Sequence, residues 1–223
     1  MTRIALIHAT PAAVGPIKDA FSEAWPEPDL VNLLDDSLSR DRALAPQLTD
    51  GLFRRFDALG RYALSFGADA ILFTCSAFGP AIERVARSAD IPVLKPNEAM
   101  FADAIALGGT IGMVATFEPS IASMTEEFEE QADRAGVAAT LKSVLAPTAM
   151  AALQAGRREE HDALVAEAAA GLTGCAAIML AQFSMAPAAA RLRGQIRVPV
   201  LTSPASAVAE LKKRHIKGRR DPA

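Results

Sequence analysis

Residues 70–80 read AILFTCSAFGP, and residues 177–187, which lie 107 positions later, read AIMLAQFSMAP. Each stretch has a short apolar run, then a turn of small and polar residues, then a segment that is entered through proline. A short apolar run bounded by turn residues is typical of a buried strand, and proline is favoured in the first turn of a helix. The two stretches therefore predict the same strand–turn–helix unit twice.

The same offset relates two further pairs of segments without a gap. Ile4–Ile7 falls on Ile111–Val114, and Ile91–Leu94 falls on Val198–Leu201. Agreement of three apolar segments on one offset indicates an internal repeat. We therefore predict an α/β fold of two pseudo-two-fold related flavodoxin-like halves. Each half is a short parallel sheet flanked by helices, and the active site lies in the cleft between them.

The expected elements alternate between strand and helix along the chain, as in doubly wound α/β proteins. Strands are predicted at 4–8, 29–33, 71–74, 93–95, 111–115, 138–144, 177–181 and 198–202. Helices are predicted near 13–24, 40–66, 78–88, 98–107, 118–135, 147–170, 185–193 and 204–215. The predicted domains are a first half at 1–107, a second half at 108–203, and a terminal helix with a basic tail at 204–223. The sequence leaves open whether the helix that begins near residue 204 packs on the first half.

Composition excludes several classes of function. The chain has 223 residues, is 51% hydrophobic and carries a formal net charge of −3, so nothing favours binding to nucleic acid. No apolar run approaches the length of a membrane span, and the N-terminus lacks the pattern of a signal peptide. The histidines are scattered along the chain, and the two cysteines do not form a regular spacing pattern. We therefore expect a cytoplasmic protein with free thiols, without a metal site or a membrane partner.

Ligands of open parallel sheets bind beyond the carboxyl ends of the strands, and Cys75 follows such an end. Positive ends of helices lower the pKa of a thiol, which would make Cys75 an acid/base group or a nucleophile. The alternative is a buried cysteine that packs as a small apolar group. Cys175 lies at the start of its predicted strand, at the end away from the expected ligand site, and we interpret it as structural.

Other polar residues share these strand ends. His8 is placed to bond a substrate or to pair with the thiol, or else it is a polar residue satisfied by its neighbours. The hydroxyls at the strand ends are candidate donors to a carboxylate, or else they are helix N-caps; they belong to Thr10, Thr74, Ser76, Thr116, Ser184 and Thr202. No glycine-rich phosphate loop follows the first strand, so we expect no nucleotide cofactor.

The duplicated halves, the LFTCS turn and the IPVL segment resemble the aspartate/glutamate/hydantoin racemase superfamily over nearly the whole chain. The loop from His8 to Pro11 and the segment ending at Thr116 are also similar. The resemblance implies a cofactor-independent enzyme that acts on a small carboxylate, and by analogy a homo-oligomer. It matches Cys75 to the first catalytic cysteine. It also implies substrate contacts at strand ends in both halves, from Thr10, Pro11, Thr74, Ser76, Thr116, Phe183 and Ser184.

One position departs from the pattern of the superfamily. Its racemases use two cysteines, one from each half, yet the offset of 107 places Gln182 opposite Cys75 in the repeat. Glutamine donates and accepts hydrogen bonds but exchanges no proton near neutral pH. Three interpretations stay open. The chain is a racemase or isomerase with Cys75 as its single thiol, a one-cysteine lyase such as a malonate-type decarboxylase, or a carboxylate-binding protein without chemistry.

Overall fold

The structure is a computed structural model that describes residues 1–220, with side chains for residues 1–216. Part of the predicted basic tail lies outside the described residues: positions 221–223, and the side chains of Lys217, Arg219 and Arg220. The chain divides into two compact units. Unit 1 comprises Met1–Pro96 together with the chain from Ala207 onward, and unit 2 comprises Asn97–Ser206.

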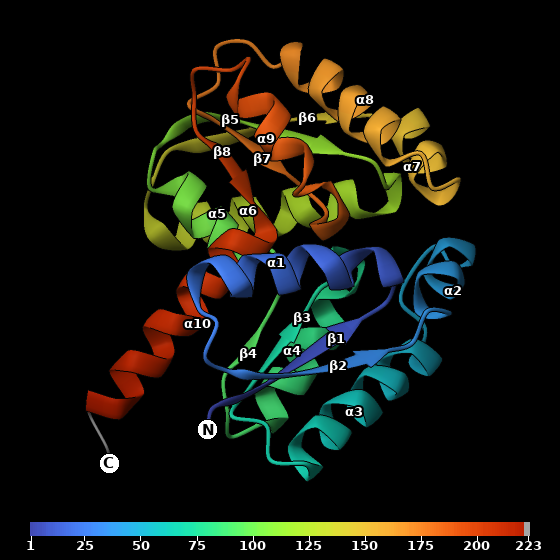
Figure 1. Cartoon of the computed structure of the whole chain (residues 1–223), viewed down its shortest axis with the longest axis vertical. Helices are drawn as coiled ribbons and strands as arrows, with labels where there is room; N and C mark the ends of the chain where they lie inside the picture. Colours follow the sequence, from blue (N-terminus) through green and yellow to red (C-terminus); the bar gives the residue numbers. More distant parts are fainter. Residues whose placement is uncertain (221–223) are drawn as a thin grey trace. The chain divides into compact units, whose positions relative to one another are not determined.

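Unit 1 is built on a sheet of four parallel strands in the order β2-β1-β3-β4 (Figure 1). The strands are β1 (Arg3–His8), β2 (Asp29–Leu34), β3 (Ala70–Phe73) and β4 (Val93–Leu94). The two inner strands are almost wholly buried, as expected for parallel strands that are covered on both faces. All four strands had been predicted from their apolar runs.

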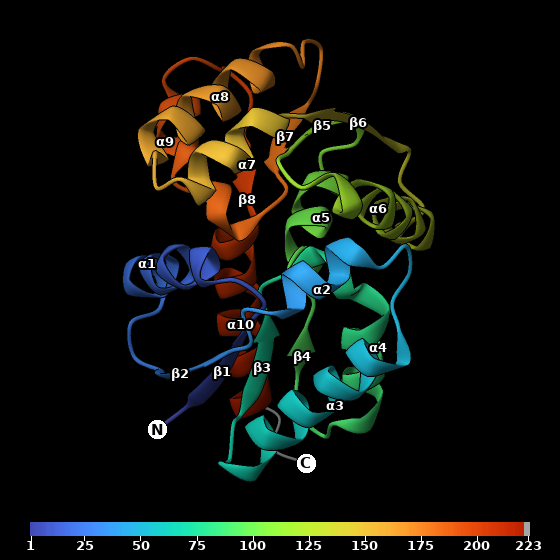
Figure 2. The same cartoon turned by 90° about the vertical axis from the view of Figure 1, so that its right-hand side faces the viewer.

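The helices of unit 1 follow its strands in turn. They are η1 (Pro11–Ala13), α1 (Val14–Ala24), α2 (Leu38–Leu44), α3 (Asp50–Ser65), η2 (Ser76–Phe78), α4 (Gly79–Ser88) and the later part of α10 (Ser203–Arg220). Helices α3 and α4 lie together on one side of the sheet (Figure 2). Phe56 of α3 packs its ring 5.2 Å from that of Phe73 and 4.7 Å from that of Phe78. This aromatic cluster fixes α3 against the carboxyl end of β3.

Unit 2 repeats the arrangement with the strand order β6-β5-β7-β8. Its strands are β5 (Gly109–Ala115), β6 (Ala139–Leu145), β7 (Ala177–Leu180) and β8 (Val200–Thr202). Its helices are α5 (Glu98–Ile105), η3 (Glu118–Ser120), α6 (Ile121–Ala135), α7 (Pro147–Gln154), α8 (Arg158–Ala170), η4 (Phe183–Met185), α9 (Ala188–Arg193) and the start of α10. The α/β class and the two short parallel sheets are therefore confirmed.

Two apolar cores cover the two faces of the second sheet. Along β7, Ile178 and Leu180 point into a core shared with α7, α8 and α9. Ala177 and Met179 alternate with them and point into a core shared with α5 and α6. Figure 1 shows these two groups of helices on opposite sides of the sheet. The continuous apolar run of β7 thus serves two cores at once.

Strand register shows how closely the two sheets correspond. Ile4 pairs with Ala70 in unit 1, and Ile111 pairs with Ala177 in unit 2, so both partners are shifted by 107 positions. Ile71 with Val93 and Ile178 with Val200 show the same shift. The outer strand β2 differs: Ile4 pairs with Leu30, whereas Ile111 pairs with Leu141, so the first crossover is four residues longer in unit 2 and the second is four residues shorter.

Two predicted helices are wrong in extent, because each is broken into two. The helix expected at 40–66 is α2 and α3, separated around Pro46, where Ala45 is extended. Proline lacks the N–H that helical bonding needs, and it disfavours helical backbone at the residue before it. The helix expected at 147–170 is α7 and α8, separated at Gly156, whose φ of +75° favours glycine.

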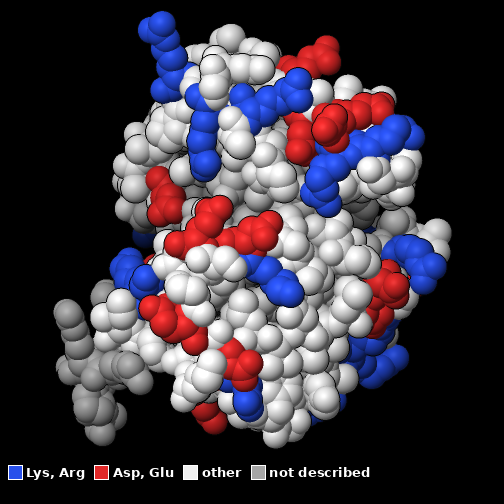
Figure 3. All heavy atoms as spheres, in the orientation of Figure 1, with Lys and Arg blue, Asp and Glu red and all other residues white. Residues whose placement is uncertain are grey.

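Charged side chains are distributed without a broad region of one sign on the face drawn in Figure 3, where basic and acidic residues are interspersed. Within residues 1–220, no helix combines the length and the apolar character that a bilayer span requires. The expectations about nucleic acid, oligomerisation and the cleft between the halves stay predictions.

We expect Gly60→Ala to destabilise unit 1. A Cβ at Gly60, inside α3, would lie 2.6 Å from Cγ1 of the buried Val85 on α4. Alanine favours a helix over glycine by up to about 1 kcal/mol, but overpacking costs about 1–3 kcal/mol. The net loss is measurable by urea unfolding. The matched control is Gly15→Ala in α1, where a Cβ meets nothing within 4 Å and stability is expected to hold or rise. An equal gain in both variants would contradict the close packing of α3 on α4.

Candidate functional site

A polar chain that is buried at His8 and Thr74 and exposed at Asn32 crosses the carboxyl ends of three strands in unit 1. His8, which is fully buried, links Asn32 of β2 to Thr74, the residue after β3. Its Nε2 lies 3.0 Å from Oδ1 of Asn32, and its Nδ1 lies 2.9 Å from Oγ1 of Thr74. Since Oδ1 is an acceptor, Nε2 carries the proton in the neutral ring. The Thr74 hydroxyl then shares its single hydrogen between Nδ1 of His8 and the carbonyl of Ile7, which lies 3.3 Å away. Both ring nitrogens are therefore engaged within unit 1.

The state of His8 follows from its surroundings. Burial lowers the pKa of His8, and the hydrogen bond with Asn32 only partly opposes this. The ring is therefore neutral near neutral pH. Both ring nitrogens already have hydrogen-bond partners within the protein. The geometry therefore favours a role for His8 in holding Thr74, next to Cys75, rather than in taking a proton from a ligand.

Cys75 lies at the turn from β3 into η2 and is partly buried, with an extended backbone at φ −126° and ψ 121°. Burial raises the pKa of its thiol. Hydrogen bonds from the Ala77 N–H and the Ser39 hydroxyl, and the charge of Arg42, lower it in part. The expected lowering is therefore wrong in sign: η2 has only three residues, and its dipole does not offset the loss of water.

Helix α2 supplies two neighbours of Cys75 that sequence reasoning missed. The Ser39 hydroxyl donates to the carbonyl of Ala9 at 2.8 Å, and it stabilises the Cys75 thiolate only when its single hydrogen turns to the sulfur instead. Arg42 donates from Nε to the carbonyl of Ala77 at 3.2 Å and from Nη1 to that of Ala45 at 2.7 Å. These backbone contacts hold the guanidinium beside the η2 turn. Both residues had been expected inside or at the edge of one long helix, and Pro46 was the signal that α2 is separate.

Helix α2 is itself anchored to α3 by a charged network. The guanidinium of Arg55 donates to the carboxylates of Asp35 and Asp41 and to the hydroxyl of Ser37. Burial alone would raise the pKa of Asp35, but hydrogen bonds from Arg55 and Ser37 outweigh it and lower that pKa. The network therefore fixes the loop from β2 into α2, and with it the position of Arg42.

Gln182 occupies the position in unit 2 that Cys75 has in unit 1. Its Oε1 accepts from the backbone N–H of Thr116 at 2.9 Å and lies 3.2 Å from the Thr116 hydroxyl. Its Nε2 donates to Oγ of Ser120 at 3.0 Å, and that hydroxyl donates to the carbonyl of Phe117 at 2.8 Å. The amide of Gln182 therefore ties the end of β7 to the loop after β5.

The remaining predicted residues lie at the same two sheet edges. Thr10 caps η1 by accepting from the Ala12 N–H at 3.4 Å, and Pro11 is exposed at the start of η1. Ser76 follows Cys75 and is buried, as are Phe183 and Ser184 after Gln182. The structure thus gathers His8, Thr74, Cys75 and Ser76 in unit 1. It gathers Thr116, Gln182, Phe183 and Ser184 in unit 2, and one shared site for both sets stays a prediction.

Among the side chains that the structure describes, no three His, Cys, Asp or Glu residues form a potential metal site.

Cys175, which had been interpreted as structural, is buried in the core of unit 2, with its Sγ 3.9 Å from the carbonyl of Thr173.

The model of the Asp/Glu/hydantoin racemase family matches residues 17–211. The chain belongs to this family. Membership makes it an enzyme of the racemase superfamily, as the resemblance had implied. No curated protein sequence matches the chain significantly.

Solved structures with the same fold have low sequence identity to this family member. Allantoin racemase from Klebsiella pneumoniae is 20% identical, with 98% of this chain and 89% of that one covered and a TM-score of 0.68. A glutamate racemase from Bacillus anthracis is 15% identical, with 97% and 83% covered and a TM-score of 0.73. A Gly74Cys mutant of arylmalonate decarboxylase is 14% identical, with 94% and 92% covered and a TM-score of 0.65. These likenesses establish the fold.

We expect Arg42→Gln to raise the pKa of Cys75, because the charge of Arg42 lowers it. The pH profile of alkylation by iodoacetamide then moves to higher pH, and labelling at a fixed pH below the midpoint slows. The matched control is Arg40→Gln on the same helix, an exposed arginine that is expected to leave the profile unchanged. Cys75→Ala gives the background from Cys175. An unshifted profile in Arg42→Gln would contradict the electrostatic role of Arg42.

We expect Gln182→Ala to destabilise unit 2 by about 1–3 kcal/mol, because the Thr116 N–H loses its acceptor in a mostly buried place. Urea unfolding measures this loss. Gln154→Ala removes an exposed amide of α7 and is expected to change stability by less than about 0.5 kcal/mol. Equal stabilities of the two variants would show that the bonds of Gln182 contribute nothing.

Proposed function

We propose that the protein is a cofactor-independent, racemase- or isomerase-like enzyme that acts at the carbon next to a carboxylate or carbonyl. Its substrate is a small acid of the amino acid or hydantoin class, and Cys75 is its single thiol acid/base. Membership in the racemase family supports the reaction class. The observation that carries the proposal is the thiol of Cys75 at the end of β3, where two hydrogen-bond donors and a guanidinium face it.

The proposed chemistry moves one proton at that carbon. The Cys75 thiolate takes the proton, and the electron pair of the broken C–H bond spreads onto the adjacent carboxylate or carbonyl. Hydroxyls and backbone N–H groups stabilise the resulting negative charge. Thr10, Ser76 and Ser184 are the proposed donors, with Pro11 and Phe183 as further contacts. Thr74, held by His8, completes the turn around the thiol.

Inversion at carbon needs a proton delivered to the opposite face. Gln182, which we propose to orient that face together with Thr116, does not exchange a proton near neutral pH. Its amide is already engaged with Thr116 and Ser120. With Cys75 alone, a proton that leaves and returns on one face gives exchange with retained configuration. The expected signature is therefore exchange that is faster than racemisation.

The second candidate is a one-cysteine lyase such as a malonate-type decarboxylase. It is favoured by the pKa of Cys75, which burial raises, so that the thiol is protonated near neutral pH. In this reaction the C–C bond to one carboxylate breaks and releases carbon dioxide. The electron pair stays on the carbon and takes the thiol proton, and water then restores that proton. One proton donor suffices for this cycle.

Three further expectations belong with this proposal. The enzyme acts on free small carboxylates without a protein partner in the chemistry, forms homo-oligomers, and works in the cytoplasm. They are supported by the two unpaired cysteines and by the family assignment. Sedimentation of the purified chain tests the assembly.

The deciding experiment is incubation in deuterium oxide with amino acids, hydantoins and aryl- or alkyl-substituted malonates. Deuterium incorporation at the carbon next to the carbonyl supports the first proposal, and carbon dioxide release from a malonate supports the second. Cys75→Ala is expected to lower either activity by a factor of about 10²–10⁴, typical of a lost acid/base group. Full activity in this variant would remove Cys75 from the mechanism. Binding without exchange or release would leave the chain a carboxylate-binding protein.

A further inference from the structure

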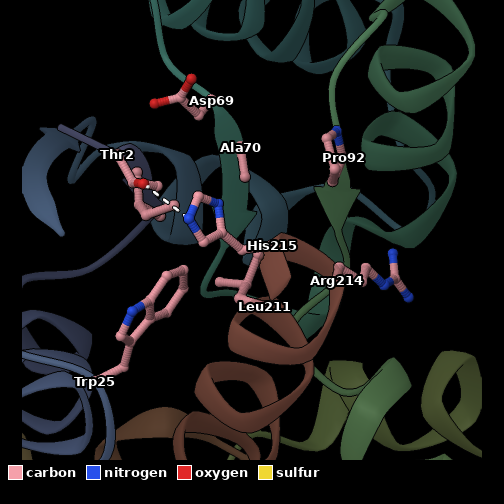
Figure 4. Close-up of a pocket in the computed structure, with 9 residues that line it drawn as sticks. Thr2, Trp25, Asp69, Ala70, Pro92, Leu211, Arg214 and His215 are labelled. Carbon is pink, nitrogen blue, oxygen red and sulfur yellow. Dashed lines mark hydrogen bonds between the residues drawn. The ribbon is translucent and has the colours of Figure 1, made fainter. Parts of the chain in front are cut away.

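A cavity of about 280 Å³ lies within unit 1, at the amino-terminal edge of its sheet (Figure 4). It is bordered by the starts of β1 and β3, the end of α1 and the later part of α10, and it opens to solvent. Its lining includes Thr2, Trp25, Asp69, Leu211, Arg214 and His215. The volume is close to the lower end of the range for pockets that bind small molecules, about 300 Å³.

This cavity is separate from the candidate catalytic groups. Ile4 lines the cavity near the start of β1, whereas His8 ends the same strand on the side of Cys75. Four residues of strand at about 3.3 Å each put roughly 13 Å between these two positions. None of the predicted site residues lines the cavity.

The wall of the cavity is apolar and held in place before any ligand binds. Trp25 is only 6% exposed, and its ring lies 6.0 Å from that of Phe21. The His215 ring lies 5.4 Å from that of Trp25, tilted by 42°. Nε2 of His215 lies 3.1 Å from the hydroxyl of Thr2, as Figure 4 shows, and Leu211 completes the floor. The two rings and the leucine make this part of the lining mainly apolar, which favours an apolar aromatic body as the occupant.

The rim of the cavity carries a carboxylate. Asp69 accepts a hydrogen bond at Oδ2 from the Arg3 N–H at 2.7 Å, and within the described part of the chain it makes no ion pair. Its charge is therefore available to a cation. Beside the cavity, Glu210 accepts a hydrogen bond from Nε of Arg214 at 2.8 Å, and this ion pair offsets the charge of Arg214.

We propose that this cavity binds a small primary amine with an aromatic body, with its ring against Trp25 and its ammonium at Asp69. The aromatic wall sets the shape of the ligand, and the carboxylate at the rim sets its charge. The proposal does not depend on the reaction of Cys75, because the two places lie at opposite ends of β1.

The chain offers a direct probe, because Trp25 is its one tryptophan. Phenethylamine and hydrocinnamate have the same aromatic body and opposite charges. Titration with phenethylamine is expected to change the Trp25 emission saturably, and hydrocinnamate is expected to bind at least tenfold more weakly. Calorimetry on the same samples measures binding even where the emission is insensitive. Absence of saturable binding of the amine in both measurements would overturn the proposal.

Three variants locate the site. Asp69→Asn is expected to abolish the preference for the amine, whereas Asp133→Asn, an exposed carboxylate of α6 that does not line the cavity, is expected to keep it. Cys75→Ala is expected to bind phenethylamine as tightly as the unaltered protein. An unchanged preference in Asp69→Asn, or lost binding in Cys75→Ala, would place the amine elsewhere and refute the assignment.

Discussion

Strand β3 pairs with β1 in parallel, with Ile7 opposite Phe73, and the Thr74 N–H donates to the carbonyl of Ile7 at 3.0 Å. This register brings Thr74 alongside His8 and sets the direction in which the chain turns at Cys75. A slip of one residue would turn each side chain of β3 to the opposite face, and Phe73 would leave its aromatic partner Phe56 on α3. The arrangement of the unit 1 site therefore depends on the pairing of these two short strands.

The position of Cys75 at a strand end could be predicted because apolar runs and turns are local signals. The offset of 107 was likewise visible, since Ile71 and Ile178 carry the same pattern in the sequence. Contacts between distant elements gave no such signal. Ser39 and Arg42 reach the thiol only because α2 folds back from the edge of the sheet, and Asn32 reaches His8 only because β2 pairs with β1. Ser120 shows the same limit, since its bond to Gln182 spans 62 positions.

The electrostatics of the thiol needed the structure as well. A turn from strand to helix suggests a lowered pKa for the thiol. The direction of the pKa shift, however, depends on how much water remains around the sulfur. Around Cys75, the loss of water outweighs two hydrogen-bond donors and one guanidinium. Such a thiol holds its proton readily and releases it to a stronger base, such as a carbanion. Burial, rather than the nearest charge, therefore shapes its chemistry.

The bonds of Gln182 have a consequence for how this position changes over evolutionary time. A cysteine there lacks the reach and the amide needed to bond Thr116 and Ser120 together. A single codon change to cysteine would leave the Thr116 N–H without its acceptor in a mostly buried place. The loop after β5 would have to adapt first. A second thiol at this position would therefore require compensating changes in the loop that Gln182 now holds.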